Sequence, residues 1–243
     1  MTENENSPEN LRKFLESDDP APLVRMGKLV EINEAIAVNF LLKNLEDKYT
    51  ANPAIVVLNE NVNWESKKIE KLKPMAVKLL TKKLSSDPTT DDLAIKNILI
   101  QIGENAIEPL IKDLESKNGD LRCHAADALR DIADKRAIKP LIKALEDSED
   151  YYLRPGIHIK CAEALGLLGD ERAVPSLINA LDDEYRDMDG NYTVRKAASI
   201  ALVKITRANI KGKKQDNIIK FLESKDPAMV RMGASMLKGI LEE

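Results

Sequence analysis

One recurring phrase limits what this chain can fold into. Apolar residues stand at i, i+3, i+4 and i+7 in three stretches: AIEPLIKDLE at 106–115, AIKPLIKALE at 137–146 and AVPSLINALD at 173–182. This spacing is typical of a helix with one apolar face, which we name the B helix. The same frame fits four further stretches, at 10–16, 37–46, 76–85 and 217–223.

A second phrase alternates with the first and predicts the other helix of a hairpin, the A helix. It reads LRCHAADAL at 121–129, IHIKCAEAL at 157–165 and VRKAASIAL at 194–202, with a looser copy, VRMGASMLK, at 230–238. Small residues recur in it, and because the distance between packed helices follows side-chain size, they predict close packing of neighbouring A helices. These residues are Ala125, Ala128, Ala164, Ala198 and Ala201.

The turns between these helices have helix-ending and helix-starting residues. Asp134, Asp170 and Glu104 stand before B helices, where a carboxylate can accept hydrogen bonds from free amides. Pro20 and Pro227 follow B helices, where proline ends a helix and a nearby aspartate can cap the next one. Helical hairpins of about thirty residues therefore repeat along the chain.

Neither helix of such a hairpin can bury its apolar face unless the next hairpin stacks against it. The predicted fold is all-α, an α-solenoid of about six to seven stacked antiparallel helical hairpins that forms one domain over residues 1–243. We predict a flexible tail at 1–9 and a degenerate repeat at 48–72, whose Trp64 fills an imperfect core.

Composition excludes several classes of protein. Only 4% of residues are aromatic and 10 are glycine, which favours helix over strand. The net charge of −4 disfavours nucleic acid as a partner. Cys123 and Cys161 form no metal-binding spacing, as is usual for thiols in a reducing compartment. No apolar run approaches the length of a membrane span, so we predict a cytoplasmic protein without a membrane partner.

The combined pattern resembles a known family. VRxxAAxAL followed by GDxRAVPxLIxAL and an Asp-rich turn, at 121–145, 157–181 and 194–202, is similar to the HEAT repeat in the short form named after phycobilin lyase subunits. The resemblance spans roughly residues 10–242 and implies a HEAT-like superhelix. Proteins of this family include scaffolds, chromophore-lyase subunits, a metal-dependent hydroxylase and DNA-repair enzymes, so the resemblance alone selects no single function.

Two turns depart from the period. The step from the last leucine of a B helix to the equivalent small residue of the next A helix is 14 residues from Leu114 to Ala128, but 19 from Leu145 to Ala164 and 20 from Leu181 to Ala201. These inserted loops, at 147–156 and 183–193, contain residue types that anchor protein interfaces: Tyr151, Tyr152, Arg154, Tyr185, Arg186 and Tyr192. The alternative is that the tyrosines cover the edges of the core.

The second inserted loop also contains DMDGN at 187–191, which is similar to a calcium-binding loop through Asp187 and Asp189. However, Tyr185 and Lys196 occupy the first and the closing ligand positions, where calcium needs carboxylates. We therefore expect a simple turn.

Lysine occupies one position of the B helix in six of its seven copies, two residues before the final leucine. On the predicted concave face this lysine column comprises Lys43, Lys82, Lys112, Lys143 and Lys220, with Lys13 in the first copy. An acidic residue follows three positions later in most copies, so we interpret the column as ion pairs within each helix, on a solvated face, rather than as a phosphate site.

No catalytic or metal-binding constellation stands out. His124, His158, Cys123 and Cys161 lie on neighbouring A helices, but their spacing is unlike a compact zinc motif. The His-Glu pairs that the resemblance would require for a hydroxylase are missing, as are a glycine-rich phosphate loop, GxSxG and HExxH. We predict no enzyme activity, no cofactor and no metal.

Arginine recurs near the start of the A helix, at Arg25, Arg122, Arg195 and Arg231, with His158 in one copy. The resemblance implies that these arginines bind turn aspartates between repeats, with Asp19 and Asp226 as candidates.

The sequence thus favours a non-enzymatic scaffold or assembly factor. It would bind another protein through the lysine column, the tyrosine-rich loops, or both. Two alternatives remain: an accessory subunit of a chromophore-lyase-like enzyme, and a nucleic-acid-binding solenoid.

Overall fold

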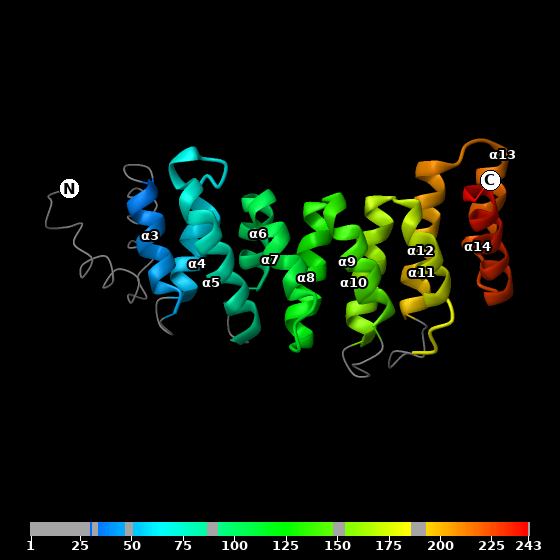
Figure 1. The fold of residues 1–243 in the computed structure, drawn as a ribbon, viewed down its shortest axis with the longest axis horizontal. Helices are drawn as coiled ribbons and strands as arrows, with labels where there is room; N and C mark the ends of the chain where they lie inside the picture. The colour runs from blue at the N-terminus through cyan, green and yellow to red at the C-terminus, as the bar shows by residue number, and fades with distance from the viewer. Residues whose placement is uncertain are drawn as a thin grey trace, which may run out of the picture. The chain divides into compact units, whose positions relative to one another are not determined.

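The computed structural model describes residues 30, 34–46, 51–86, 92–147, 154–185 and 193–242, and these residues form helices without any strand (Figure 1). The predicted all-α fold is confirmed, and it is an α-solenoid. The chain divides into two compact units, residues 1–109 and 110–243, with the division inside one helix. That the whole chain acts as one domain stays a prediction, and the tail at 1–9 lies outside the described residues.

In the first unit B and A helices alternate, and the unit ends within its third B helix. Its elements are α3 (Glu34–Asn44), α4 (Ala51–Asn61), the 3-10 helix η1 (Lys67–Leu72), α5 (Lys73–Ser86), α6 (Asp92–Ile102) and the start of α7 (Glu104–Asp113). The two A helices, α4 and α6, pack together, while α3 packs on α4 and α5 packs on α6. Repeating antiparallel helices therefore already form in this unit.

The degenerate stretch at 48–72 forms α4, a loop and η1. Trp64 in that loop is 1% exposed, and its indole Nε1 donates to the carbonyl oxygen of Leu58 at 3.1 Å. The side chain is thus packed in the core with its one polar group satisfied, as is usual for a buried tryptophan. The prediction that Trp64 belongs to the core is confirmed.

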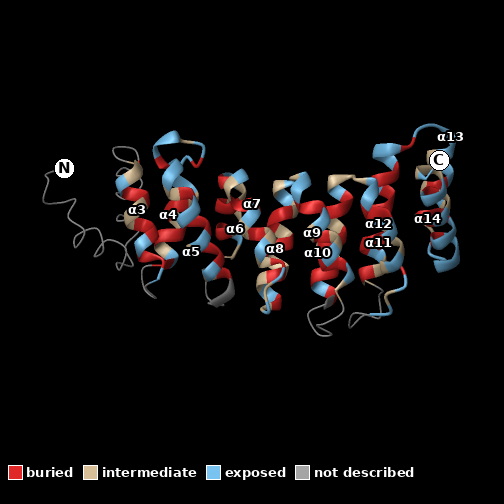
Figure 2. Ribbon diagram, in the orientation of Figure 1, coloured by how far each residue is buried: buried red, intermediate tan, exposed pale blue. Residues whose placement is uncertain are grey.

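The second unit continues the same alternation of A and B helices. Its elements are the end of α7, then α8 (Gly119–Ile132), η2 (Lys135–Ala137), α9 (Ile138–Glu146), α10 (Arg154–Leu168), η3 (Glu171–Ala173), α11 (Val174–Ala180), α12 (Thr193–Asn209), α13 (Lys213–Leu222) and α14 (Pro227–Leu241). A helices stack on A helices, α8 on α10 and α10 on α12, while α9 contacts α11 in the B layer. Each of these helices carries both buried and exposed residues (Figure 2).

The A helices approach one another closely through small residues, as their sequence predicts. Ala125, Ala164 and Ala198 are fully buried. At Gly166 of α10 the backbone of α12 comes so near that a Cβ atom would lie 2.6 Å from the Cα of Ala201. Only glycine fits there, because real Cβ atoms do not approach a backbone atom so closely.

Two of the predicted aspartate caps are present, on the 3-10 turns η2 and η3 that lead directly into the B helices α9 and α11. The Asp134 carboxylate accepts from the amide of Arg136 at 2.8 Å, and that of Asp170 accepts from the amide of Arg172 at 3.0 Å. The Arg172 guanidinium also binds Asp170, and this hydrogen bond, more than any other interaction, lowers the pKa of Asp170. Glu104, the third candidate, is instead the first residue of α7.

Replacing Asp170 with alanine is expected to lower the free energy of unfolding by about 1 kcal/mol at neutral pH, since the helix loses its cap. The folded-state pKa of Asp170 lies below its unfolded value, so its contribution is complete above the unfolded pKa of about 4 and disappears as the pH falls through the lower, folded-state pKa. Urea unfolding of D170A and wild type should therefore converge in acid. The exposed Glu184, replaced by alanine, is the control; an equal difference at every pH would contradict the cap.

The arginine or histidine side chain near the start of the A helix forms hydrogen bonds to the B-to-A turns. Arg122 donates from Nη2 to Asp147 at 2.6 Å, and Arg195 donates from Nε to the carbonyl of Leu181 at 2.8 Å. In the copy with histidine, Nε2 of His158 lies 2.9 Å from the carbonyl oxygen of Asp147. The expected bond to a turn aspartate is confirmed at Arg122, whereas Arg195 and His158 bind backbone carbonyl groups of the turn instead.

The prediction that Asp226 binds an arginine of the A helix is wrong. Within the described part of the chain, Asp226 does not bind an arginine but caps α14, accepting from the amide of Ala228 at 2.9 Å. Arg231 instead pairs with Asp182, which follows α11. Asp19 and Arg25 lie outside the described residues.

Candidate functional site

The five described lysines of the column are exposed, and Lys13 lies outside the described residues. Lys43 and Lys82 belong to the first unit, on α3 and α5, and Lys112, Lys143 and Lys220 to the second, on α7, α9 and α13. Helix placement alone explains the exposure, because each lysine stands on the polar side of an amphipathic helix.

Two lysines of the column, Lys82 and Lys143, form ion pairs between helices, whereas pairs within one helix were expected. Lys82 reaches Glu46, 36 residues earlier, at 3.0 Å, and Lys143 reaches Glu115, 28 residues earlier, at 2.6 Å. Both lysines thus pair with the acidic residue that follows the preceding B helix, and Lys143 does so although Glu146 stands at i+3. The physical reason is that neighbouring B helices lie within reach of a long lysine side chain. At these two positions the lysine column therefore bridges successive repeats.

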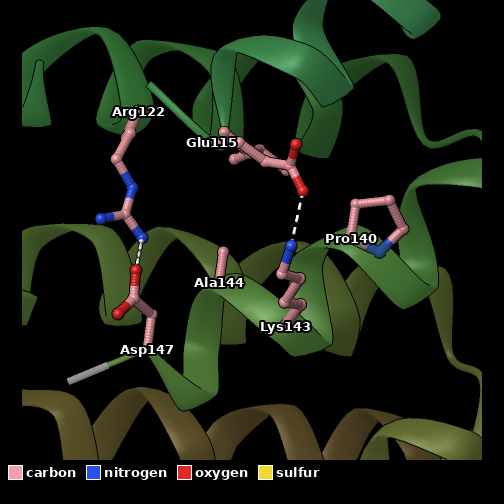
Figure 3. A pocket seen from close by; sticks show the side chains of 7 residues that line it. Glu115, Arg122, Pro140, Lys143, Ala144 and Asp147 are labelled. Atoms are coloured by element: carbon pink, nitrogen blue, oxygen red, sulfur yellow. Dashed lines mark hydrogen bonds and ion pairs between the residues drawn. The ribbon is translucent and has the colours of Figure 1, made fainter. Parts of the chain in front are cut away.

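A hollow of about 300 Å³ opens beside the second of these bridges (Figure 3). We name it the α9 hollow, and its lining residues come from the end of α7, from α8 and from α9: Leu114, Glu115, Arg122, Pro140, Lys143, Ala144 and Asp147. Leu114 and Ala144 are 3% and 5% exposed and form an apolar floor. Figure 3 shows Ala144 between two ion pairs, that of Arg122 with Asp147 and that of Lys143 with Glu115.

The two ion pairs differ in burial and therefore in role. The Arg122 side chain is 11% exposed and that of Asp147 28%, whereas Lys143 and Glu115 are 75% and 63% exposed. The Lys143 hydrogen bond lowers the pKa of Glu115, and the Glu115 carboxylate raises the pKa of Lys143, so both stay charged at neutral pH. The inner pair holds the turn, while water competes for the outer pair, whose charges can be exchanged for those of a ligand.

The same arrangement recurs in the first unit. A hollow of about 120 Å³ is lined by Leu45, Glu46, Leu79, Lys82 and Lys83. Its ion pair of Lys82 with Glu46 is as open as the one above, at 66% and 64% exposure. An apolar floor next to an exposed Lys-Glu bridge therefore occurs in both units.

Most residues of the two tyrosine-rich inserted loops lie outside the described residues. Tyr151, Tyr152, Arg186 and Tyr192 lie outside the described residues, as does the side chain of Arg154, although Arg154 begins α10. Asp187 and Asp189, the weak calcium candidates, also lie outside them. Tyr185 is described, is 39% exposed, and donates its amide to Asp183. That these residues anchor a protein interface stays a prediction.

The four candidate zinc ligands do not converge in the described structure, where no group of three or more His, Cys, Asp or Glu side chains could hold a metal ion. Burial raises the pKa of Cys123 to about 11 and that of Cys161 to about 12. Both thiols are therefore protonated at neutral pH, which makes them poor nucleophiles and poor metal ligands.

One surface feature was missed by the sequence analysis, a groove of about 710 Å³ between α12 and the α13–α14 turn. A sequence signal for it exists. Leu237 of α14 stands where Ala128, Ala164 and Ala201 stand in α8, α10 and α12, so α14 lacks the small residue that favours close stacking in those three helices. None of the described helices has the length and apolarity needed to cross a lipid bilayer.

Part of the chain is similar to known repeat proteins. The HEAT repeats family matches residues 74–157 and, in a second overlapping position, 107–189. No curated protein sequence matches the chain. Among solved structures, the crystal structure of an engineered protein is similar, at 22% identity and a TM-score of 0.36, over 99% of this chain and 92% of the other. Together the two matches span residues 74–189, which are similar to HEAT repeats and include α5 to α11 and the helices that form the α9 hollow.

Proposed function

We propose that this protein is a non-enzymatic interaction scaffold or assembly factor that binds another protein. The binding surface comprises the B-helix face with its lysine column, the tyrosine-rich inserted loops, or both. The proposal includes a cytoplasmic location and repeats of the short phycobilin-lyase-like type. HEAT repeats are structural units able to bind proteins, and stacked repeats offer extended surfaces for that purpose.

The observation that carries the proposal is the recurrence of one surface arrangement in both units. The bridges of Lys82 with Glu46 and of Lys143 with Glu115 each adjoin an apolar floor and are mostly exposed. A partner can replace one half of each bridge and cover the floor without disturbing the core. Acidic and basic side chains are both present, which favours a protein partner over a uniformly charged polyanion.

Affinity capture followed by mass spectrometry tests the proposal. The bait is the full chain, in native-source extract treated with nuclease. The lysine-column variant K82E/K143E reverses both bridging lysines, and a second variant replaces Tyr151, Tyr152, Tyr185 and Tyr192 with alanine. The control K213E/K214E makes the same charge change at two exposed positions of α13. Circular dichroism must first show that every variant is folded.

We expect a discrete protein that wild type and control capture and that at least one of the two test variants loses. Loss in the lysine-column variant supports the B-helix face, and loss in the tyrosine variant supports the inserted loops. Retention by both would overturn the assignment of the surface. Recovery of nucleic acid, of a bound chromophore or of no enriched protein would overturn the function.

A further inference from the structure

The last A helix does not stack as the others do. α10 packs extensively on both α8 and α12, whereas α14 packs mainly on α13 and makes little contact with α12. At Gly233 a Cβ atom would lie 2.7 Å from the Cβ of Phe221, so α14 is held close to α13. Where the next A helix would lie against α12, the second unit instead has the 710 Å³ groove.

The groove has an apolar floor and one exposed apolar residue. Val203 of α12, Leu222 of α13 and Val230 of α14 lie at its base and are 6%, 1% and 6% exposed. Ile200 is 47% exposed at its side, and it also lines a neighbouring hollow with Leu167, which is 52% exposed. Apolar surface therefore continues from the groove across α10, which is typical of a surface that another chain covers.

Charge in the groove has the opposite sign to that of the whole chain. Five basic residues line it, and one acidic residue: Arg195, Lys196, Lys204, Arg207 and Lys225 against Glu223. Glu223 is already paired with Arg207 at 3.2 Å. Lys196, Lys204 and Lys225 are exposed along the rim. In a chain of net charge −4, this concentration of positive charge next to an apolar floor indicates an acidic and partly apolar ligand.

We infer that this groove binds an acidic amphipathic helix of a partner protein. The α12 stretch from Arg195 to Arg207 is about 18 Å long at 1.5 Å per residue, enough for about three turns of a docked helix. A helix fits because the groove lies beside α12, where a further A helix would stack as α8 and α12 stack on α10. The apolar face of the partner would cover Ile200 and Val203, with its acidic residues near Lys196 and Lys204. This inference shares with the proposed function only the premise that the chain binds proteins.

A synthetic peptide tests the groove without a known partner. The probe is a fluorescent helical peptide of about 18 residues with leucine at i, i+3, i+4 and i+7 and glutamate beside that stripe. Fluorescence anisotropy gives its Kd for the full chain. We expect K196E/K204E and I200D each to weaken binding at least about tenfold, while the equal charge change of K213E/K214E leaves Kd unchanged. Because I200D introduces a charge, I200A serves as a second variant and should also weaken binding.

Two control peptides show whether binding depends on the amphipathic pattern and on the negative charge of the probe. A peptide with the same composition in scrambled order, and one with lysine in place of glutamate, should both bind at least about tenfold more weakly. Equal binding of the scrambled peptide, or equal Kd values for all variants, would overturn the inference. Tighter binding of a single-stranded oligonucleotide, lost in K196E/K204E, would also overturn it and make the groove a polyanion site. The lysine-column variant K82E/K143E should bind the peptide normally, so failure here and failure of the proposed function are distinguishable.

Discussion

Replacing Trp64 with alanine is expected to lower the free energy of unfolding of the first unit by about 3–5 kcal/mol, the usual cost of removing a buried tryptophan. The side chain is 1% exposed and its indole satisfies the carbonyl of Leu58, so truncation leaves both a cavity and an unsatisfied acceptor. Urea unfolding followed by far-UV circular dichroism measures the change. Fluorescence cannot follow the variant, because Trp64 is the only tryptophan of the chain.

The matched control for this change is W64F, which keeps an aromatic ring in the core and loses the indole hydrogen bond. It should cost clearly less than W64A. A loss of no more than about 0.5 kcal/mol for W64A, the range of ordinary surface substitutions, would show that Trp64 does not hold this degenerate repeat together.

The second large loss of stability is expected from the replacement of Gly166 with alanine, which adds a single methyl group. G166A should destabilise the second unit by about 1–3 kcal/mol, since overpacking forces backbone shifts. The new Cβ would lie 2.6 Å from the Cα and 2.8 Å from the Cβ of Ala201, so α10 and α12 must move apart. Thermal and urea unfolding by circular dichroism give the change in stability.

The chain provides a control for G166A with the opposite expected sign. Gly239 is exposed in α14 and nothing lies within 4 Å of the Cβ that alanine would add. G239A should therefore stabilise the protein by about 0.5–1 kcal/mol, because alanine favours a helix over glycine. If both substitutions stabilise the protein, then α10 and α12 are not in the close contact described above.

Much of the fold follows from residue spacing. The i, i+3, i+4, i+7 pattern predicted the B helices, and the aspartates before two of them, Asp134 and Asp170, predicted their caps. The C-terminal stretch FLESKDPAMVRMG at 221–233 forms the end of α13, a turn and the start of α14, as the repeat frame requires. Its near-copy at 14–27 lies outside the described residues. These features are local, so a single sequence contains enough information to predict them.

Features that depend on the distance between helices were harder to predict. Lys143 has acidic residues available both at i+3 and on the preceding B helix, and only the helix spacing decides in favour of Glu115. The groove beside α12 arises because α14 packs on α13, a choice between two apolar neighbours that periodicity does not determine. The bulk of Leu237 was a signal for it, which becomes meaningful only once the close contact at Gly166 is known.

In the function proposed above, the chain binds a partner protein through surfaces repeated on its B helices and through its inserted loops. Hydrogen–deuterium exchange of the full chain, alone and with the partner obtained by capture, tests it most directly. We predict slower exchange in α5, α9 and the turns that follow them, or in the inserted loops at 147–156 and 183–193, with little change at the start of α13. Unchanged exchange in all of these segments while the partner is bound would contradict the claim.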